Sequence, residues 1–267
     1  MTPTVEKVAK PLIIKVCGMR DPQNIADLIQ LPIDYIGFIF YEKSPRYVTS
    51  VPDFNAIDGV ISNHPVNTPM IKKVGVFVNA DMGFVIEKIK QFDLDVVQLH
   101  GKETPQYLSE LNTSLRGVAR NEAKQKNEEL KAAYSKLNTS ELTSKNSSFI
   151  INHSSLVEVW KAFSVDETFD FETTKPYEHI ADKFLFDTKT PQHGGSGQKF
   201  DWNILTHYAG ETPFFLSGGI SAADTEGVKK IAHPQLFGLD INSKFEIAPA
   251  LKDIGLLKTF IDSVRLA

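Results

Sequence analysis

Eight short apolar segments, most of them separated by helix-like stretches, place the strongest limit on how this chain can fold. The segments are rich in Val, Ile, Leu and Phe, and their apolar residues follow one another directly. Runs of this kind are typical of parallel strands that are buried on both faces. The eight segments are LIIKVCGM (12–19), YIGFIF (35–40), KKVGVFV (72–78), VVQLHG (96–101), EVWKAFSV (158–165), KFLFDTK (183–189), TPFFLSGGI (212–220) and QLFGLDINSKF (235–245).

The stretches between these segments predict an α/β fold. DPQNIADLIQ (21–30) opens with Asp and Pro, a common helix start, and KDIGLLKTFIDSVRLA (252–267) has the apolar stripe of a packed helix. Eight βα units in a chain of 267 residues favour a closed (β/α)8 TIM barrel that forms a single domain over residues 1–267. An open doubly wound sheet is the alternative that the pattern alone permits.

Residues 112–157 do not fit the repeating pattern. This segment is polar, low in aromatic residues and rich in Lys, Glu, Asn and Ser. Such a composition buries too little apolar surface to form a core of its own. It falls between the fourth helix and the fifth strand, and connections of that type lie on the face opposite a barrel's active site. We therefore expect a polar insertion on that face, without a catalytic role.

Composition and charge narrow the class of protein. The 29 basic and 33 acidic residues give a net charge of -4, which provides no basic surface for nucleic acid. A single cysteine excludes an intramolecular disulfide and suits a reducing cytoplasm. The N-terminal residues lack the features of a secretory signal, and no apolar run approaches the roughly 18 residues of a membrane span. We expect a cytoplasmic protein with no nucleic-acid or membrane partner.

Polar residues and glycines gather where the predicted strands end. Barrel enzymes keep their active sites at this carboxyl end, so the clustering predicts a site there. A glycine-rich stretch, GGSG (194–197), follows the sixth strand. The candidate residues outside that stretch are Cys17, Arg46, Gln98, His100, Asp187, Ser217, Gly218, Gly219, Asp240, Asn242 and Ser243.

Seven motifs stand at these strand ends in chain order: KVCGM, GFIF followed by SPRYV, VGVFVN, VQLHG, DT followed by GGSGQKFDW, LSGGI, and LDINSKFE followed by KD. In both order and spacing these motifs resemble phosphoribosylanthranilate isomerase. The resemblance covers roughly residues 12–111 and 158–265. It implies an Amadori rearrangement of N-(5-phosphoribosyl)anthranilate to 1-(2-carboxyphenylamino)-1-deoxyribulose 5-phosphate in tryptophan biosynthesis.

The implied reaction needs an acid to open the ribose ring and a base to remove a proton from its second carbon. It calls for no metal and no organic cofactor. Cys17 resembles the general base of the family, and Lys15, two residues away on the same strand face, is expected to favour its thiolate. Asp187 resembles the general acid, which burial would keep protonated. From the residues alone, Cys17 could be a structural cysteine and Asp187 a capping residue.

The substrate phosphate is expected to lie against glycine-rich loops, because glycines let the main chain approach its oxygens closely. By themselves these stretches could equally be tight turns. The expected phosphate-binding residues are Gly194, Gly195, Ser196, Gly197, Ser217, Gly218 and Gly219. After the eighth strand the chain departs from the family pattern of Ser-Ser-Gly. Asn242, Ser243 and Lys244 occupy those places, and Ala250 stands where a glycine is common.

Arg46 matches the arginine that binds the anthranilate carboxylate in the family, and a guanidinium fork suits a planar carboxylate. Without the resemblance, Arg46 would be read as a solvated surface residue. Gln98 and His100 are expected to line the wall of the site, with Asp240 beside them. No His-x-His or Glu-x-x-His spacing marks a metal site.

Two other functional classes remain as rivals. A Schiff-base aldolase could use Lys15 as its nucleophile, and a degenerate barrel could bind phosphorylated ligands without catalysis. The presence of both Cys17 and Asp187 argues against each. Cys17 also disfavours the related sugar isomerases of histidine biosynthesis, which use paired aspartates. The sequence leaves open whether the protein is a monomer or a homodimer.

Overall fold

The computed structural model of the chain describes residues 12–50, 70–117, 157–189 and 199–265. Within these residues, eight parallel strands form a closed barrel in the order in which they occur along the chain. Every strand predicted from an apolar run is present, so the barrel is confirmed and the open sheet is excluded. The strands are β1 (Ile13–Val16), β2 (Tyr35–Ile39), β3 (Lys72–Phe77), β4 (Val96–Leu99), β5 (Glu158–Val165), β6 (Lys183–Thr188), β7 (Phe214–Leu216) and β8 (Leu236–Ile241).

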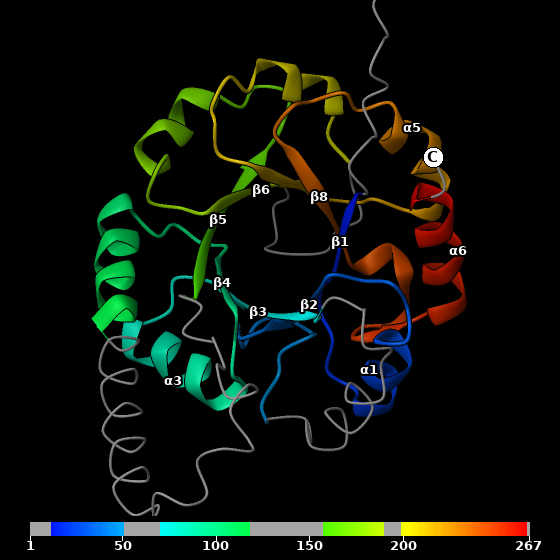
Figure 1. Ribbon diagram of the computed structural model, residues 1–267, viewed down its shortest axis with the longest axis horizontal. Helices are drawn as coiled ribbons and strands as arrows, with labels where there is room; N and C mark the ends of the chain where they lie inside the picture. The colour runs from blue at the N-terminus through cyan, green and yellow to red at the C-terminus, as the bar shows by residue number, and fades with distance from the viewer. Residues whose placement is uncertain (1–11, 51–69, 118–156, 190–198, 266–267) are drawn as a thin grey trace, which may run out of the picture.

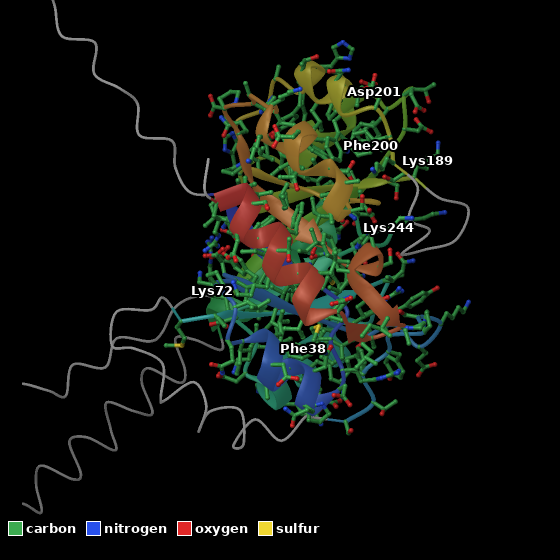
Figure 2. All side chains as sticks on the ribbon, turned by 90° about the vertical axis from the view of Figure 1, so that its right-hand side faces the viewer. Phe38, Lys72, Lys189, Phe200, Asp201 and Lys244 are labelled. Carbon is green, nitrogen blue, oxygen red and sulfur yellow. The ribbon has the colours of Figure 1, made fainter. Side chains whose placement is uncertain are left out.

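The barrel closes where its first and last strands pair. Lys15 of β1 lies opposite Asp240 of β8, and Val16 lies opposite Ile241. Figure 1 looks down the barrel, with the strands in the middle and the helices around them. Because neighbouring strands are parallel, all their carboxyl ends emerge on one side of the molecule. Figure 2 shows the barrel from its side: Lys72, which begins β3, lies at one end, and Lys189 and Lys244, which follow β6 and β8, lie at the other.

The outer layer combines α-helices with shorter 3-10 helices. Helix α1 starts with a proline at its first position, and the side chain of Asp21 caps it by accepting from Asn24 N at 2.8 Å. The α-helices are α1 (Pro22–Leu28), α3 (Met82–Phe92), a helix over residues 105–117, α5 (Thr225–Lys229) and α6 (Ile254–Arg265). The 3-10 helices are η1 (Phe171–Tyr177), η2 (Trp202–His207), η3 (Ala222–Asp224) and η4 (Ser243–Phe245).

The second half of the barrel departs from regular βα units. Among the described residues, η1 follows β5 and η2 follows β6, where a regular barrel has full α-helices. Pro176 lies inside η1 and provides no backbone N–H, so it disfavours a longer α-helix there. A two-stranded antiparallel sheet, β9 (Glu246–Ala248) and β10 (Leu251–Lys252), also intervenes between η4 and α6.

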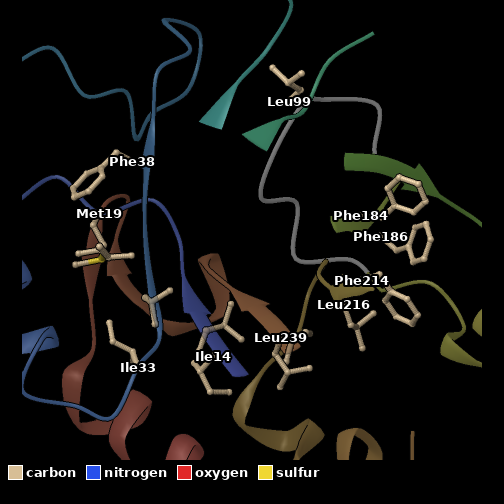
Figure 3. Packing of buried hydrophobic residues seen from close by; sticks show 14 of the residues in the cluster. Ile14, Met19, Ile33, Phe38, Leu99, Phe184, Phe186, Phe214, Leu216 and Leu239 are labelled. Carbon is tan, nitrogen blue, oxygen red and sulfur yellow. The ribbon is translucent and has the colours of Figure 1, made fainter. Parts of the chain in front are cut away.

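Two apolar clusters hold the fold together. The larger one packs the outward faces of the strands against the helices, and Figure 3 shows Ile14, Leu216 and Leu239 of neighbouring strands within it. The smaller cluster fills the barrel interior and consists of Tyr35, Val74, Val96, Trp160, Ala162, Leu185 and Phe215. Burial of these side chains is the main favourable contribution to folding.

The interior cluster is aromatic, and ions border it at the amino ends of the strands. The ring centroids of Tyr35 and Trp160 lie 5.1 Å apart, and those of Trp160 and Phe215 lie 4.8 Å apart. Glu158, the first residue of β5, forms ion pairs with Lys72 at 2.8 Å and with Lys183 at 2.5 Å. The barrel interior is therefore filled with side chains below its carboxyl end.

The polar insertion predicted over residues 112–157 falls largely outside the described residues, which omit 118–156. Its two flanks are described. Asn112, Leu115 and Arg116 line a small cavity of about 100 Å³ together with Val157 and Glu158. Glu158 begins β5, so both flanks meet at the amino end of the strands. Residues 118–156 themselves lie outside the described part of the chain, so the face on which the insertion lies stays a prediction.

No helix in the described parts of the chain is both long enough and apolar enough to span a membrane.

Candidate active site

Cys17 directly follows β1 and is buried at the carboxyl end of the barrel. Its backbone N–H donates to Ile241 O at 2.9 Å, which fixes the residue beside the end of β8. The space for its side chain depends on Gly37 of β2, because a Cβ atom at that position would lie 2.8 Å from Cys17 Sγ. Gly37 is therefore part of the site, although it is not among the predicted site residues.

Lys15 lies beside Cys17, but its ammonium is already paired. Lys15 Nζ donates to Asp240 Oδ1 at 2.7 Å, and both side chains are buried. Burial acts to lower the pKa of Lys15, and the carboxylate of Asp240 outweighs it, so the pKa is raised and the amine is held protonated. A protonated, paired lysine is not a nucleophile, which argues against a Schiff-base aldolase.

Lys15 favours the Cys17 thiolate as expected, because its charge and its hydrogen bond lower the pKa of the thiol, but the net direction of that pKa in the free protein is upward. Burial raises the pKa of the Cys17 thiol, and this effect exceeds the opposing charge of Lys15. The carboxylate of Asp240 raises that pKa as well. The sequence correctly predicted that the Lys15 ammonium lies beside Cys17. It could not show that a carboxylate on the neighbouring strand β8 would offset the effect of that ammonium on the thiol.

Gln98, His100 and Asp187 form a hydrogen-bonded chain from the end of β4 to β6. Gln98 Nε2 lies 3.1 Å from His100 Nδ1, and His100 Nε2 lies 3.1 Å from Asp187 Oδ2. With the Gln98 amide assigned in this orientation, Nδ1 accepts and Nε2–H donates to the carboxyl group. The Asp187 side chain is 18% exposed, so it can reach a ligand in the barrel mouth. His100 is therefore a direct partner of Asp187 as well as a wall residue.

The loop after β7 has the backbone geometry of a close-approach site. Gly218 and Gly219 have φ angles of 89° and 67°, in the left-handed region that favours glycine. A Cβ atom on Gly218 would collide with the backbone N and the hydroxyl of Thr188. Ser217 Oγ lies 3.4 Å from Asp240 Oδ2, which ties this loop to the Lys15 pair. The other predicted phosphate loop, Gly194–Gly197, lies outside the described residues.

The segment after β8 explains some of the departures from the family pattern. Asn242 and Ser243 lie where η4 begins, which is a usual position for a phosphate in barrels. The Oδ1 atom of Asn242 accepts from Lys252 Nζ at 2.7 Å, whereas Lys244 is exposed. Ala250 has a φ of 66° and is buried, so the glycine that is common there meets a conformational need.

Arg46 is buried, not solvated, and one edge of its guanidinium is occupied. Its Nε and Nη2 atoms donate to the two carboxylate oxygens of Glu246 at 2.8 and 2.6 Å. Lys252 Nζ donates to Glu246 Oε1 at 2.6 Å. We call these three residues the Arg46 cluster. Glu246 and Lys252 are not among the predicted site residues, although both lie within motifs that carry the family resemblance, because charged residues in a polar loop give no sign of being buried.

Within the described residues, no three His, Cys, Asp or Glu side chains form a cluster that could hold a metal ion.

Comparisons with known proteins agree with this geometry. The family model for N-(5'phosphoribosyl)anthranilate (PRA) isomerase matches residues 14–143 and 124–263. The N-(5'-phosphoribosyl)anthranilate isomerase of Parabacteroides distasonis is 41% identical over 253 residues, which cover 95% of this chain and 93% of that protein. The enzyme of the same name from Phocaeicola vulgatus is 34% identical over 254 residues, covering 95% of this chain and 98% of that protein.

Solved structures show the same fold. Phosphoribosyl anthranilate isomerase from Thermotoga maritima superimposes with a TM-score of 0.67 at 25% identity, covering 96% of this chain and all of that one. The isomerase from Thermus thermophilus gives a TM-score of 0.66 at 20% identity, over 95% and 98% of the two chains. From the match of the family model and the identity to the curated relatives, this chain belongs to the N-(5'-phosphoribosyl)anthranilate isomerase family.

Proposed function

We propose that this chain converts N-(5-phosphoribosyl)anthranilate into 1-(2-carboxyphenylamino)-1-deoxyribulose 5-phosphate, with Cys17 as general base and Asp187 as general acid. The observation that carries the proposal is the position of these two residues at the carboxyl ends of β1 and β6, which β7 and β8 separate in the barrel. Asp240 interacts with both residues. Burial and the charge of Asp187 raise the pKa of Asp240, and the charge of Asp240 in turn raises the pKa of Cys17. An acid and a base that face one cavity can each act on a different atom of one bound sugar.

The reaction proceeds in two proton transfers followed by tautomerisation. Asp187 gives its proton to the ribose ring oxygen, the bond from that oxygen to the first carbon breaks, and a protonated imine forms. Cys17 then removes the proton from the second carbon, and the electron pair of that bond forms the carbon–carbon double bond of an enolamine. The enolamine tautomerises to the ketone. Every atom of the substrate remains in the product, so the rearrangement has no net oxidant or reductant.

Cys17 must lose its proton before it can act as the base. In the free protein burial holds the thiol protonated, and the nearby charge of Lys15 opposes that effect. A protonated imine brings a further positive charge into the barrel mouth, which favours the thiolate at the step that needs it. A desolvated thiolate is also a stronger base than a solvated one, because water no longer stabilises its charge.

The two ends of the substrate have separate binding regions in this proposal. The phosphate binds to Gly194–Gly197, Ser217–Gly219 and the Asn242–Ser243 turn, where glycines and small hydroxyls expose backbone N–H groups. The positive φ angles of Gly218 and Gly219 support this assignment. Arg46 binds the anthranilate carboxylate through the edge of its guanidinium that Glu246 does not occupy.

We also propose a cytoplasmic protein with no nucleic-acid partner, consistent with its single cysteine and its net charge of -4. Both candidate oligomeric states have precedent, since one Thermotoga maritima structure is described as monomers generated from a dimeric isomerase. Sedimentation of the purified protein distinguishes a monomer from a homodimer. The insertion is proposed to lie on the face opposite the site, as its flanks suggest.

A fluorescence assay that follows the loss of the anthranilate-conjugate substrate tests the proposal. Purified, folded protein is expected to consume freshly prepared substrate, and Cys17→Ala protein is the matched blank. A folded wild-type protein that leaves fresh substrate unchanged would refute the proposed isomerase activity. Borohydride trapping of Lys15 with a carbonyl substrate would instead support the aldolase.

A further inference from the structure

The Arg46 cluster contains more charge than carboxylate binding by a single arginine requires. Arg46 and Lys252 contribute two positive charges and Glu246 one negative charge, and all three side chains are at most 8% exposed. Buried ions are costly unless each is paired, so such a group persists when its members satisfy one another. Two cations and one anion leave one net positive charge in the cluster, and one incoming carboxylate would neutralise it.

We propose that Glu246 and Lys252 are positioning residues that prepare Arg46 for the anthranilate carboxylate. Glu246 holds the guanidinium by its Nε–Nη2 edge, and Lys252 neutralises Glu246 so that Arg46 keeps its charge for the ligand. The proposal rests on the assignment of Arg46 as the carboxylate-binding residue under the proposed function.

The geometry of the guanidinium supports the first part. The two donors from Arg46 to Glu246 form a parallel fork, which fixes the plane of the group. Among the described residues no partner contacts Nη1, so the second edge of the guanidinium remains for a ligand. Arg46 Cδ also lies within 2.6 Å of where a Cβ of Gly18 would be, and Gly18 directly follows Cys17. The fork therefore holds the guanidinium beside the base.

Hydrogen bonds fix the backbone of the loop that carries Arg46, so the fork to Glu246 acts on the side chain alone. Arg46 N donates to Ser44 Oγ at 3.2 Å, and Val48 N donates to Ile39 O at 3.0 Å at the end of β2. These bonds set the backbone, whereas the long arginine side chain still has several rotatable bonds. Glu246 removes that side-chain freedom before the ligand arrives, and preorganisation of this kind lowers the entropy that binding must overcome.

The environment of Lys252 supports the second part. Its ammonium contacts Glu246 Oε1 at 2.6 Å and Asn242 Oδ1 at 2.7 Å. Its backbone is anchored on both sides by Asn24 of α1, which accepts from Lys252 N at 2.7 Å and donates to Lys252 O at 2.9 Å. Burial lowers the pKa of Lys252 to about 8, which leaves most of the amine charged at neutral pH. Without this charge, Arg46 and Glu246 would cancel.

Two ligands separate this role from a general structural one. The first is reduced 1-(o-carboxyphenylamino)-1-deoxyribulose 5-phosphate, the compound present in a solved isomerase complex, and the second is the same compound without the ring carboxyl group. The ratio of their dissociation constants, measured by calorimetry, is the carboxylate preference. Wild-type protein is expected to prefer the carboxylated ligand, and Arg46→Ala should abolish the preference.

Glu246→Gln and Lys252→Met should each reduce the carboxylate preference about tenfold, the size of one lost charge-assisted hydrogen bond. For Glu246→Gln, affinity for the ligand without the carboxyl group should stay within about twofold, since that ligand makes no demand on Arg46. Lys252→Met also removes the donor to Asn242 of the proposed phosphate turn, so it is judged by the ratio of the two ligands, both of which carry the phosphate. In turnover assays KM should rise while kcat changes little, because the carboxylate contact is the same in the ground and transition states. Glu158→Gln is the matched control, since Glu158 is also a lysine-paired carboxylate but lies at the other end of the barrel; it should keep the full preference.

The inference is overturned if Glu246→Gln retains the wild-type preference, or if it weakens both ligands equally, which is the result expected of a residue that only maintains the fold. If Glu246→Gln fails to fold, Glu246→Asp keeps the charge and shortens the arm by one methylene, and it must then show the same selective loss. A full preference in Arg46→Ala would refute the role of Arg46 and with it this inference. Wild-type protein that binds neither ligand would refute the proposed function itself.

Discussion

His100 Nε2 lies 3.1 Å from Asp187 Oδ2, so one hydrogen bond joins the end of β4 to β6 at the barrel mouth. The partner of His100 on its other side is Gln98, which sets the direction in which the ring donates. A carboxyl group that receives this N–H has one oxygen fixed and the other available to a ligand. Under the proposed function, this bond would orient Asp187 for proton transfer.

Replacing either proposed catalytic residue should lower kcat with little loss of stability. We expect Cys17→Ala and Asp187→Asn each to reduce kcat by about 10² to 10⁴, with smaller effects on KM. Asp81 caps α3 through Gly83 N and provides the contrast. Asp81→Ala should cost about 1 kcal/mol of stability and leave turnover nearly intact. Measuring kcat and the thermal midpoint on the same samples separates these cases; an Asp187→Asn protein that behaves like the Asp81 variant would make Asp187 a capping residue.

The pH profile of kcat/KM should rise into the alkaline range. A general base is active only when deprotonated, and burial raises the pKa of Cys17, so fewer thiolates are present at a given pH than for an exposed thiol. The rising limb in the free enzyme should therefore lie above the ordinary thiol value of about 8.5. Titration of thiolate absorbance near 240 nm, with Cys17→Ala as the blank, reports the same ionisation. A thiol that titrates well below neutrality would contradict the raised value.

Arg46→Ala should mainly weaken binding of the anthranilate end. Loss of a charge-assisted fork costs roughly 1.5–3 kcal/mol, or about ten- to a hundredfold in affinity. The affinity of a carboxylated product analogue measures this directly. Unchanged affinity would mean that Arg46 does not bind the carboxylate and only forms the ion pair with Glu246.

Gly218→Ala should damage both the fold and phosphate binding. A methyl group there meets the backbone N of Thr188, and the φ of 89° is unfavourable for any residue with a Cβ. We expect a lower thermal midpoint. We also expect KM to rise more than tenfold, because the end of β6 at Thr188 must shift to make room for the methyl group. Gly117→Ala is the control, since nothing lies within 4 Å of its added Cβ and the residue is helical. That variant should gain about 0.5–1 kcal/mol of stability with unchanged kinetics. A fully active Gly218→Ala protein would argue against this loop as a phosphate site.

Shortening the insertion should leave catalysis intact. Replacing residues 121–146 with a short Gly-Ser linker is expected to keep kcat/KM within about threefold, because surface loops tolerate such changes. Closure entropy changes by only about 0.6 kcal/mol for each doubling of loop length, so stability should shift little as well. The flanks at Arg116 and Val157 lie near each other at the amino end of the strands, which allows a short bridge. A hundredfold loss of activity in a deletion that still folds would instead place this segment over the site.

The strands could be predicted from the sequence because their burial on both faces requires uninterrupted apolar runs. KKVGVFV and EVWKAFSV, for example, gave β3 and β5 almost to the residue. The helical layer was less predictable, since η1 and η2 depend on local packing and on Pro176 more than on periodicity. Sequence patterns carry little information about such short 3-10 turns.

The candidate site followed the same division. Positions at strand ends were predictable, because parallel strands bring all their carboxyl ends together. Ion pairs between residues far apart in the sequence were not predictable. Asp240 pairs with Lys15, 225 residues away in the sequence, and Glu246 pairs with Arg46, 200 residues away. Net electrostatic effects, such as the direction of the Cys17 pKa, depend on those pairings and on burial. They therefore required the three-dimensional structure.

The rings of Tyr35, Trp160 and Phe215, which meet edge-to-face or tilted, fill the barrel interior below the carboxyl ends of the strands. With this layer below and the strands around, a ligand can reach the residues at the strand ends only from the side of the carboxyl-end loops. Substrate and product are isomers that carry the same phosphate and the same carboxylate, so they compete for one set of contacts. Accumulated product should therefore inhibit turnover by excluding substrate, which raises the apparent KM and leaves kcat unchanged.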